Sequence, residues 1–261
     1  MLTQYDKVQI FRSLHVAGRP LVLFNIWDAG SAKAVAEAGA AALATGSWSV
    51  AAAQGYADGE QIPLDAALAN LRRIVAQTAL PVSVDLESGY GEAPADVGNT
   101  VAAVIEAGAV GCNLEDSFVA DGSLRPLADA AARLAQARAA ADRSRVACFV
   151  NARCDLFLRN PAAVHDAALI DAALQRARAY ADAGADGLFV PGLVDTALIA
   201  RLAAQSPLPV NVMIGPGAAS LDALAAAGVA RISYGPGPYR EAMSAVREAA
   251  AAIYGASGSG I

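Results

Sequence analysis

The sequence predicts an α/β fold, a single (β/α)8 TIM barrel, from three observations. Eight apolar segments of strand length alternate with segments of helical periodicity. The apolar segments are nearly continuous, which is typical of parallel strands that are covered on both faces. Several helical segments end in Ala-Gly directly before the next strand, where a glycine can end the helix. This alternation favours a closed barrel over an open doubly wound sheet.

The expected strands follow the apolar segments in chain order: 21–27 (LVLFNIW), 40–47 (AAALATGS), 82–88 (VSVDLES), 109–116 (AVGCNLED), 146–153 (VACFVNAR), 187–192 (GLFVPG), 209–215 (PVNVMIG) and 231–235 (RISYG). The expected helices are rich in Ala, Leu, Arg and Asp: 29–38, 64–78, 94–107, 127–142, 166–183, 195–205, 218–227 and 238–254. An extra helix at 4–17 is expected to cover the N-terminal end of the barrel. We expect one domain over 1–261, ordered over 4–254 and ending in a flexible Gly/Ser-rich tail at 255–261.

The charge balance excludes two classes of partner. The 261 residues carry 19 Lys and Arg against 25 Asp and Glu, which gives a net charge of −6. Nucleic acids and anionic membranes require a concentrated basic surface, and the sequence has no such cluster. No apolar run reaches the ~18–20 residues that span a bilayer, and no signal peptide is evident, so we expect a cytoplasmic protein. Cys112, Cys148 and Cys154 are expected to be buried reduced thiols, because their spacing fits neither a disulfide framework nor a zinc site.

The C-terminal ends of the strands carry the residues that indicate chemistry. Two long connections, 48–63 and 154–165, leave these ends, where barrel enzymes have their active sites. Polar residues gather at the same ends: Asp85, Glu87, Asn113, Glu115, Asp116, Asn151, Arg153, Asp155 and Asn211. Carboxylates crowded at one rim require a cation. The chain has two histidines, His15 and His165, so the oxygen-rich ligand set favours Mg²⁺, with Mn²⁺ as a substitute, over zinc.

Two further features have two interpretations each. Arg153 is either a counter-ion inside the acidic cluster or a fork for a substrate carboxylate. The pair Gly46-Ser47 is either a turn or a source of backbone N–H groups for an anion. His165 suits a helix entry or an exposed position, and we assign His15 no chemical role.

Five segments together resemble the isocitrate lyase/phosphoenolpyruvate mutase superfamily. They are Thr45-Gly46-Ser47, Gly55-Tyr56-Ala57-Asp58, Val84-Asp85-Leu86-Glu87-Ser88-Gly89-Tyr90-Gly91, Asn113-Leu114-Glu115-Asp116-Ser117 and Asn151-Ala152-Arg153-Cys154-Asp155. The similarity extends over residues 8–254, and the combination D-x-[DE]-x-G-Y-G, L-E-D and A-R-x-D is specific.

The resemblance implies a barrel in which Asp85 binds Mg²⁺ directly, while metal-bound waters are held by Asp58, Glu87 and Glu115. It implies that Arg153 clamps a substrate carboxylate and that the oxo-acid end is held by Thr45, Gly46 and Ser47. The expected catalytic residues are Arg153, Asp58 and Glu115, and Asn211 is expected to contribute to substrate binding. Family members commonly exchange the last helix between subunits, so a homodimer or homotetramer is expected.

Departures from the family pattern narrow the range of family reactions that we expect of this chain. The K-[KR]-C-G-H loop of isocitrate and methylisocitrate lyases is replaced by residues 117–126 (SFVADGSLRP), which contain no cysteine. The Lys- and Asn-bearing loop of phosphoenolpyruvate mutases is also missing, and their sixth-strand histidine corresponds to Val190 or Pro191. Pro236 stands where some oxaloacetate-decarboxylating relatives have a histidine.

The leading hypothesis is a Mg²⁺-dependent lyase that cleaves a C–C bond of a small di- or tricarboxylic acid through a metal-bound enolate and releases a 2-oxo acid. One alternative is a phosphonopyruvate-type mutase or hydrolase. The other is a catalytically reduced barrel that binds 2-oxo acids, which the missing cysteine motivates.

Overall fold

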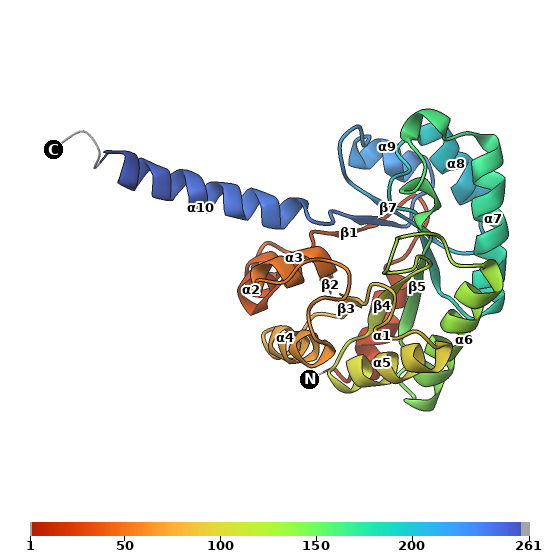
Figure 1. Cartoon of the computed structure of the whole chain (residues 1–261), viewed down its shortest axis with the longest axis horizontal. Helices are drawn as coiled ribbons and strands as arrows, with labels where there is room; N and C mark the ends of the chain where they lie inside the picture. Colours follow the sequence, from red (N-terminus) through yellow and green to blue (C-terminus); the bar gives the residue numbers. More distant parts are fainter. Residues whose placement is uncertain (1, 257–261) are drawn as a thin grey trace.

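The computed structural model describes residues 2–256 and contains an eight-stranded parallel barrel with helices around it (Figure 1). The strands are β1 Leu21–Leu23, β2 Leu43–Ala44, β3 Val82–Asp85, β4 Gly111–Glu115, β5 Phe149–Arg153, β6 Gly187–Phe189, β7 Val210–Met213 and β8 Arg231–Ser233. Their order is β1-β8-β7-β6-β5-β4-β3-β2. A parallel bridge between Ile26 and Thr45 joins the chain after β1 to the chain after β2 and completes the ring. The predicted fold class is confirmed.

The helices are α1 Gln4–Ser13, α2 Ala29–Glu37, α3 Ser47–Ala53, α4 Leu64–Ala76, α5 Pro94–Glu106, α6 Leu127–Arg143, α7 Ala167–Asp182, α8 Thr196–Gln205, α9 Leu221–Ala226 and α10 Gly237–Ala256. Two short 3-10 turns, Asp155–Phe157 and Ala162–Val164, lie in the connection after β5. Each predicted helix is present, although α1 ends at Ser13 instead of residue 17. The tail expected at 255–261 begins inside α10, and its residues 257–261 lie outside the described part of the chain.

Every predicted strand is present but shorter than the apolar segment that predicted it. In β3 the reason is local, because the sheet ends at Asp85 and Glu87 adopts a left-handed backbone with φ 50°. A left-handed residue cannot continue a strand, so the chain turns out of the sheet there. The polar residues that follow Asp85 therefore lie on the rim rather than in the barrel wall.

Helix α1 covers the N-terminal end of the barrel, as expected. Val8 and Phe11 are fully buried and pack with Val110 and Phe149 at the starts of two strand segments. The Gln4 side chain donates from Nε2 to the carbonyls of Ile105 and Ala109, both at 2.8 Å. The barrel is thus closed at this end, and access to its interior comes from the opposite rim.

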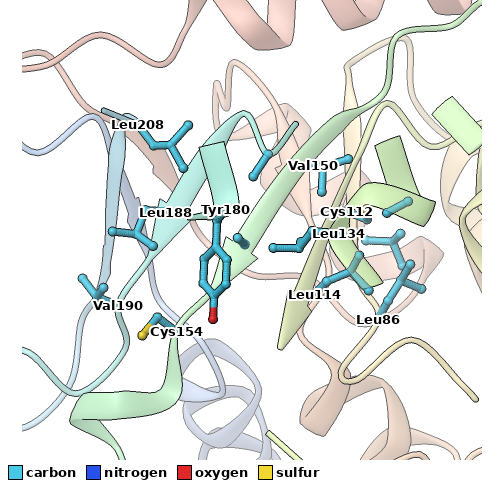
Figure 2. Packing of buried hydrophobic residues seen from close by; sticks show 14 of the residues in the cluster. Leu86, Cys112, Leu114, Leu134, Val150, Cys154, Tyr180, Leu188, Val190 and Leu208 are labelled. Carbon is cyan, nitrogen blue, oxygen red and sulfur yellow. The ribbon is translucent and has the colours of Figure 1, made fainter. Parts of the chain in front are cut away.

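The main core lies between the barrel and its outer helices. Figure 2 shows Tyr180 of α7 among side chains such as Val150, Cys154 and Leu188. Its hydroxyl donates to the buried Asp116 carboxylate at 2.6 Å, so the polar end of this large side chain is also paired. Cys112, Cys148 and Cys154 are buried free thiols, as predicted. Within residues 2–256, no helix is both long enough and apolar enough to cross a membrane.

The last helix, α10, extends away from the barrel (Figure 1). Its first turn contacts the body, because the Tyr239 ring packs against Trp27 and Trp48 with centroid distances of 5.2 and 5.8 Å. Further along α10, Val246 and Tyr254 are 61% and 77% exposed. Between α1, β1 and α2 the surface forms a largely apolar groove of about 860 Å³, whose walls include Leu14.

Candidate active site

A cavity of about 170 Å³ opens at the C-terminal ends of the strands. Its polar lining includes Asn25, Ser47, Asp58, Asp85, Asn113, Arg153 and Ser233, and its apolar lining includes Trp48, Leu158, Phe189, Pro191, Met213 and Pro236. Strand register brings two of the polar groups together, since Asp85 of β3 lies opposite Asn113 of β4. The rim predicted from the sequence therefore coincides with a real cavity.

Asp85 is hydrogen-bonded through one carboxylate oxygen, while the other has no partner among the described residues. Its Oδ2 accepts hydrogen bonds from the Ser47 N–H at 3.2 Å and from the Ser47 hydroxyl at 2.9 Å. Its own N–H donates to Thr45 Oγ1 at 3.0 Å, which fixes the backbone. Its Oδ1 is buried and has no hydrogen-bond partner among the described residues. A buried carboxylate oxygen without a partner is costly, and a bound cation would satisfy it.

Glu87 repeats this pattern next to a strained turn. Its Oε2 accepts from the Glu60 N–H at 2.9 Å, and Glu60 Oε1 accepts from the Tyr90 N–H at 2.9 Å. Its Oε1 is buried without a partner in the described chain. Glu60, Glu87 and Tyr90 all adopt left-handed backbones, with φ of 55°, 50° and 56°. Such backbone strain in non-glycine residues persists where a functional site over-determines the conformation.

Burial raises the pKa of two carboxyl groups in this acidic cluster, Glu87 and Asp58. The pKa of Glu87 rises to about 7, because the side chain is desolvated and faces Asp58 and Asp85. Burial and the nearby Asp85 also raise the pKa of Asp58. These carboxylates repel one another in their charged forms, and a bound cation would relieve the repulsion.

Arg153 is a counter-ion to two carboxylates and also reaches the cavity. Its guanidinium pairs with Glu115 through Nη1 and with the fully buried Asp155 through Nε at 2.6 Å. It therefore acts as a counter-ion, yet it also lines the cavity. Burial keeps the pKa of Glu115 raised in spite of Arg153. Because both carboxylates hold the guanidinium, its position at the cavity wall is fixed before any ligand binds.

The arrangement fits a hard cation that one carboxylate binds directly. Asp85 Oδ1 and Glu87 Oε1 are buried oxygens without partners among residues 2–256, and oxygen is the donor that Mg²⁺ prefers. In the same residues, no three His, Cys, Asp or Glu side chains are close enough to form a complete metal-binding group. Mg²⁺ commonly keeps several waters and takes one or two carboxylates, so a sparse set suits it better than zinc.

The structure separates the remaining predicted residues. Thr45 and Glu87 line a small void beside the cavity together with Ser47 and Asp85. Glu115 borders another void, which it shares with Arg153. Gly46 lines the cavity, but the Ser47 N–H beside it already donates to Asp85. Asn211 is buried inside the barrel, where its amide bonds to neighbouring strand residues.

Two of the lining residues that were not assigned to the site are asparagines. Asn25 follows β1, and its Oδ1 accepts from the N–H groups of Tyr234 and Gly235, both at 2.9 Å. Asn113 was noted as a rim residue but was not assigned to the site. Both could have been found by treating amides at strand ends on the same footing as carboxylates.

The connection after β4, residues 117–126, is folded down onto its own neighbours. Arg125 is buried and donates to Ser88 Oγ at 3.1 Å and to Asp129 at 2.9 Å, and it stacks over Phe118.

His165 bonds to the carbonyls of Phe157 and Asn160, which gives it a structural role. Among the described residues that line the cavity, the ionisable groups are Asp58, Asp85 and Arg153.

Comparison with known proteins identifies the family. Residues 11–254 match the model of the phosphoenolpyruvate phosphomutase family. The chain belongs to this family. The resemblance inferred from the five sequence segments is therefore confirmed.

Two relatives are similar to this chain over most of its length. An uncharacterized protein of Mycobacterium tuberculosis is 39% identical over 245 residues, which are 93% of this chain and 88% of that protein. The 2-methylisocitrate lyase of Salmonella typhimurium is 32% identical over 211 residues, which are 78% of this chain and 69% of the lyase.

Two solved structures are also similar. A Burkholderia cenocepacia J2315 protein, provisionally named a phosphonomutase, is 59% identical with a TM-score of 0.93 and covers 97% of this chain and 100% of its own. A phosphonopyruvate hydrolase in complex with oxalate and Mg²⁺ shares the fold, with a TM-score of 0.82 at 24% identity, over 95% of this chain and 87% of its own.

Proposed function

We propose that this chain is a Mg²⁺-dependent lyase that cleaves a C–C bond of a small di- or tricarboxylic acid and releases a 2-oxo acid. The observation that carries the proposal is Asp85, which lines the cavity and whose buried Oδ1 has no hydrogen-bond partner among the described residues, together with the fixed guanidinium of Arg153 in the same lining. This pair offers a cation ligand on one side and a carboxylate-binding group on the other. A small 2-oxo acid requires both.

The residues that would hold Mg²⁺, or Mn²⁺ in its place, are Asp85 directly and Asp58, Glu87 and Glu115 through waters. A divalent cation would supply Lewis-acid stabilisation of the negative charge that develops on the substrate's oxo oxygen. The solved phosphonopyruvate hydrolase complex with oxalate and Mg²⁺, a related barrel, supports this choice of cation and of a small dicarboxylate probe.

Arg153 would orient the substrate. Its guanidinium can form two parallel hydrogen bonds to a carboxylate, which holds that carboxylate in a defined plane. In a 2-oxo acid such as oxaloacetate, the bond that breaks can then align with the carbonyl π-system, so its electron pair passes toward the oxo oxygen. In a 2-hydroxy acid such as 2-methylisocitrate, the hydroxyl would lose its proton to become the new carbonyl, and the electron pair would leave with the departing fragment, which takes up a proton from water. Thr45, Gly46 and Ser47 would bind the oxo-acid end, with Ser47 also donating to Asp85 as it does without ligand.

The cavity lining favours a cleavage that needs little proton transfer from the protein. Its described ionisable groups are two carboxylates and one guanidinium, without Cys, His, Lys or Tyr. A departing fragment that leaves as a neutral molecule, or that takes its proton from water, suits such a lining. The limited volume of about 170 Å³ favours a small acid.

We also propose that the chain works as a homodimer or homotetramer that exchanges α10. The supporting observations are the extension of α10 away from the barrel, its exposed Val246, and the apolar groove between α1, β1 and α2. Helices in water require an apolar face to be covered. The groove of one subunit offers such cover to the helix of another.

The test uses purified protein with Mg²⁺ on oxaloacetate, alkylmalates and 2-methylisocitrate, with released 2-oxo acid as the readout. We expect turnover of at least one acid that is lost in Asp85→Ala and kept in Asp65→Asn. Asp65 is an exposed acidic residue in the first turn of α4 and serves as the matched control. Absence of turnover on the whole panel, or full turnover by Asp85→Ala, would refute the lyase.

A phosphonopyruvate-type reaction is the second candidate, favoured by the provisional name of the 59% identical Burkholderia protein. Phosphorus NMR of phosphonopyruvate incubated with the protein distinguishes it from the lyase. Tight binding of oxalate with no product from any of these acids would instead support a barrel that binds 2-oxo acids without turnover.

A further inference from the structure

A buried arginine lies inside the barrel beneath the cavity. Arg231 of β8 is fully buried, and its Nε and Nη1 have no hydrogen-bond partner among the described residues. Its Nη2 donates to Asn113 Oδ1 at 3.3 Å. A buried guanidinium with so few partners is costly, which calls for a functional reason.

Three hydrogen-bonded asparagine amides, those of Asn211, Asn151 and Asn113, connect this interior to the cavity. Asn211 determines the orientation of the amides at one end of this row. Asn211 Nδ2 faces the carbonyl oxygens of Val212 at 2.9 Å and Arg231 at 3.1 Å. Carbonyl oxygens only accept, so the Asn211 nitrogen must lie on that side. Asn211 Oδ1 then faces Asn151, whose Nδ2 donates to it at 3.2 Å.

The other end of the row is determined by Arg231. Asn151 Nδ2 also donates to Asn113 Oδ1 at 2.9 Å, so this oxygen receives two hydrogen bonds, one from Asn151 and one from Arg231. A guanidinium only donates, so it can face only the oxygen of the Asn113 amide. Flipping Asn113 would set its NH₂ group against two other donors. The amide orientation is thus imposed by groups that cannot reverse their roles.

This arrangement leaves the Asn113 nitrogen available. Nδ2 of Asn113 has no hydrogen-bond partner among residues 2–256, although both of its hydrogens can donate. Asn113 lines the cavity and lies opposite Asp85 in the strand register. A ligand oxygen bound near Asp85 would therefore lie close to an oriented N–H donor.

We propose that Asn113 is a substrate-binding residue that donates from Nδ2 to an oxygen of the bound acid, and that Arg231 is a positioning residue that fixes the Asn113 amide for this contact. The substrate class, a small 2-oxo acid, rests on the proposed function. The hydrogen bond selects an acceptor oxygen, such as a carboxylate or an oxo group, over a hydroxyl hydrogen at that position. The Asn113 contact lies on a different strand from Arg153, so the two together would hold the acid from two sides.

The test measures oxalate binding by calorimetry in the presence of Mg²⁺. Asn113→Ala is expected to raise the oxalate Kd about tenfold, the effect of one lost hydrogen bond to a charged acceptor. Asn113→Asp is expected to raise it further, by about a hundredfold, because an acceptor with negative charge replaces the donor. The Mg²⁺ affinity measured without oxalate should change less than about threefold in Asn113→Ala, and the exposed Asn99→Ala is the matched control.

Arg231 is tested through its dependence on Asn113. Arg231→Met is expected to raise the oxalate Kd about three- to tenfold, and the same change made in Asn113→Ala should have no further effect. Arg231→Lys keeps a donating cation and should recover part of the affinity. A structural role alone would give equal losses in both backgrounds. Thermal unfolding monitors folding, and Arg231→Lys in both backgrounds replaces Arg231→Met if that variant does not fold.

The outcomes are distinguishable. Wild-type protein that binds no oxalate with Mg²⁺ would overturn the proposed function and this inference together. Wild-type binding that Asn113→Ala and Asn113→Asp leave unchanged would overturn the inference alone. A full Arg231 effect in the Asn113→Ala background would overturn the positioning role.

Discussion

Ser47 holds one oxygen of Asp85 with two hydrogen bonds, from its N–H at 3.2 Å and from its hydroxyl at 2.9 Å, while the other Asp85 oxygen has no partner in the described chain. The two oxygens of a single carboxylate thus have different tasks. The first fixes the side chain to the start of α3, and the second remains available in the cavity. A ligand oxygen that is oriented in advance loses less conformational entropy on binding a cation.

Removing the Ser47 hydroxyl should weaken the site without abolishing it. In Ser47→Ala the backbone N–H bond to Asp85 remains, so we expect the Mg²⁺ Kd to rise about three- to tenfold, equivalent to one hydrogen bond. Calorimetric titration with Mg²⁺ measures this. Ser49→Ala is the control on the same helix, because the buried Ser49 hydroxyl has no hydrogen-bond partner among the described residues, Asp85 included. Equal losses in both variants would contradict the special role of Ser47.

Loss of Arg153 should destabilise the protein as well as inactivate it. Arg153→Met would leave Glu115 and the fully buried Asp155 without their cation, which we expect to cost about 3–5 kcal/mol. Urea unfolding gives this difference directly. Adding Glu115→Gln to Arg153→Met should recover part of the loss, because one uncompensated charge is removed. A loss below about 1 kcal/mol would place the ion pairs in the weak, solvent-screened class.

Mg²⁺ binding should strengthen as the pH rises through neutrality. The pKa of Glu87 in the metal-free protein is raised to about 7, so much of the carboxyl is protonated at pH 6 and must lose that proton when the cation binds. We expect the Mg²⁺ affinity to increase about tenfold between roughly pH 6 and pH 8. Glu87→Gln should show a flatter pH profile in the same calorimetric titrations. An identical profile in both proteins would assign the proton to another group.

Acid should destabilise the fold through His15. Burial and the nearby Arg231 lower the pKa of His15 from 6.5 to about 3. Below pH 6.5, His15 therefore binds a proton in the unfolded chain but remains neutral in the folded protein. Stability is therefore complete above pH 6.5 and falls by about 1.4 kcal/mol per pH unit below it, toward pH 3. Between pH 7 and pH 5, the free energy of unfolding measured in urea should fall by about 2 kcal/mol more in the wild type than in His15→Gln. Parallel changes in the two proteins would mean that carboxylates alone cause the acid sensitivity.

Exchange of α10 should be visible as an assembly that a single charge disrupts. Val246→Asp and Phe24→Asp place a carboxylate on the exposed face of α10 and in the groove, where Val246 and Phe24 are 61% and 40% exposed. We expect both variants to have a lower molar mass by light scattering after size exclusion than the wild type. Arg247→Gln, the next residue on α10, should leave the mass unchanged. A wild-type protein of monomer mass would contradict the exchange.

The sequence was sufficient to predict the fold because the alternation of apolar strand segments and helical segments is repeated eight times along the chain. Each apolar segment is bounded by helical periodicity, so an error at any one boundary left the strand order intact. The rim carboxylates were predicted for a similar reason, since residues such as Asp85 and Glu115 interrupt apolar strands at their C-terminal ends. Strand topology alone then brings them to one edge.

The parts that could not be predicted depend on contacts between distant residues. Helix α3 lies where a loop was expected. Its start at Ser47 has no side-chain cap, so no capping residue indicated a helix at this position. Arg231 looks like the polar start of a strand, and nothing local shows that it points into the barrel and meets Asn113. The same holds for Asn211, which was expected to contribute to substrate binding and whose amide bonds to the Arg231 carbonyl inside the barrel.

The first turn of α10 connects the outgoing helix to the cavity. Trp48 lines the cavity, and the same ring packs against Tyr239 and lies under the Arg240 guanidinium at 4.8 Å. A ligand that shifts Trp48 would therefore disturb the contacts at the base of α10, and in the proposed exchanged assembly a partner that holds α10 would restrict Trp48. Thermodynamic linkage makes such coupling reciprocal. If α10 is exchanged between subunits as proposed, occupancy of the cavity and the strength of subunit association would be coupled through Trp48, and a change in one would report on the other.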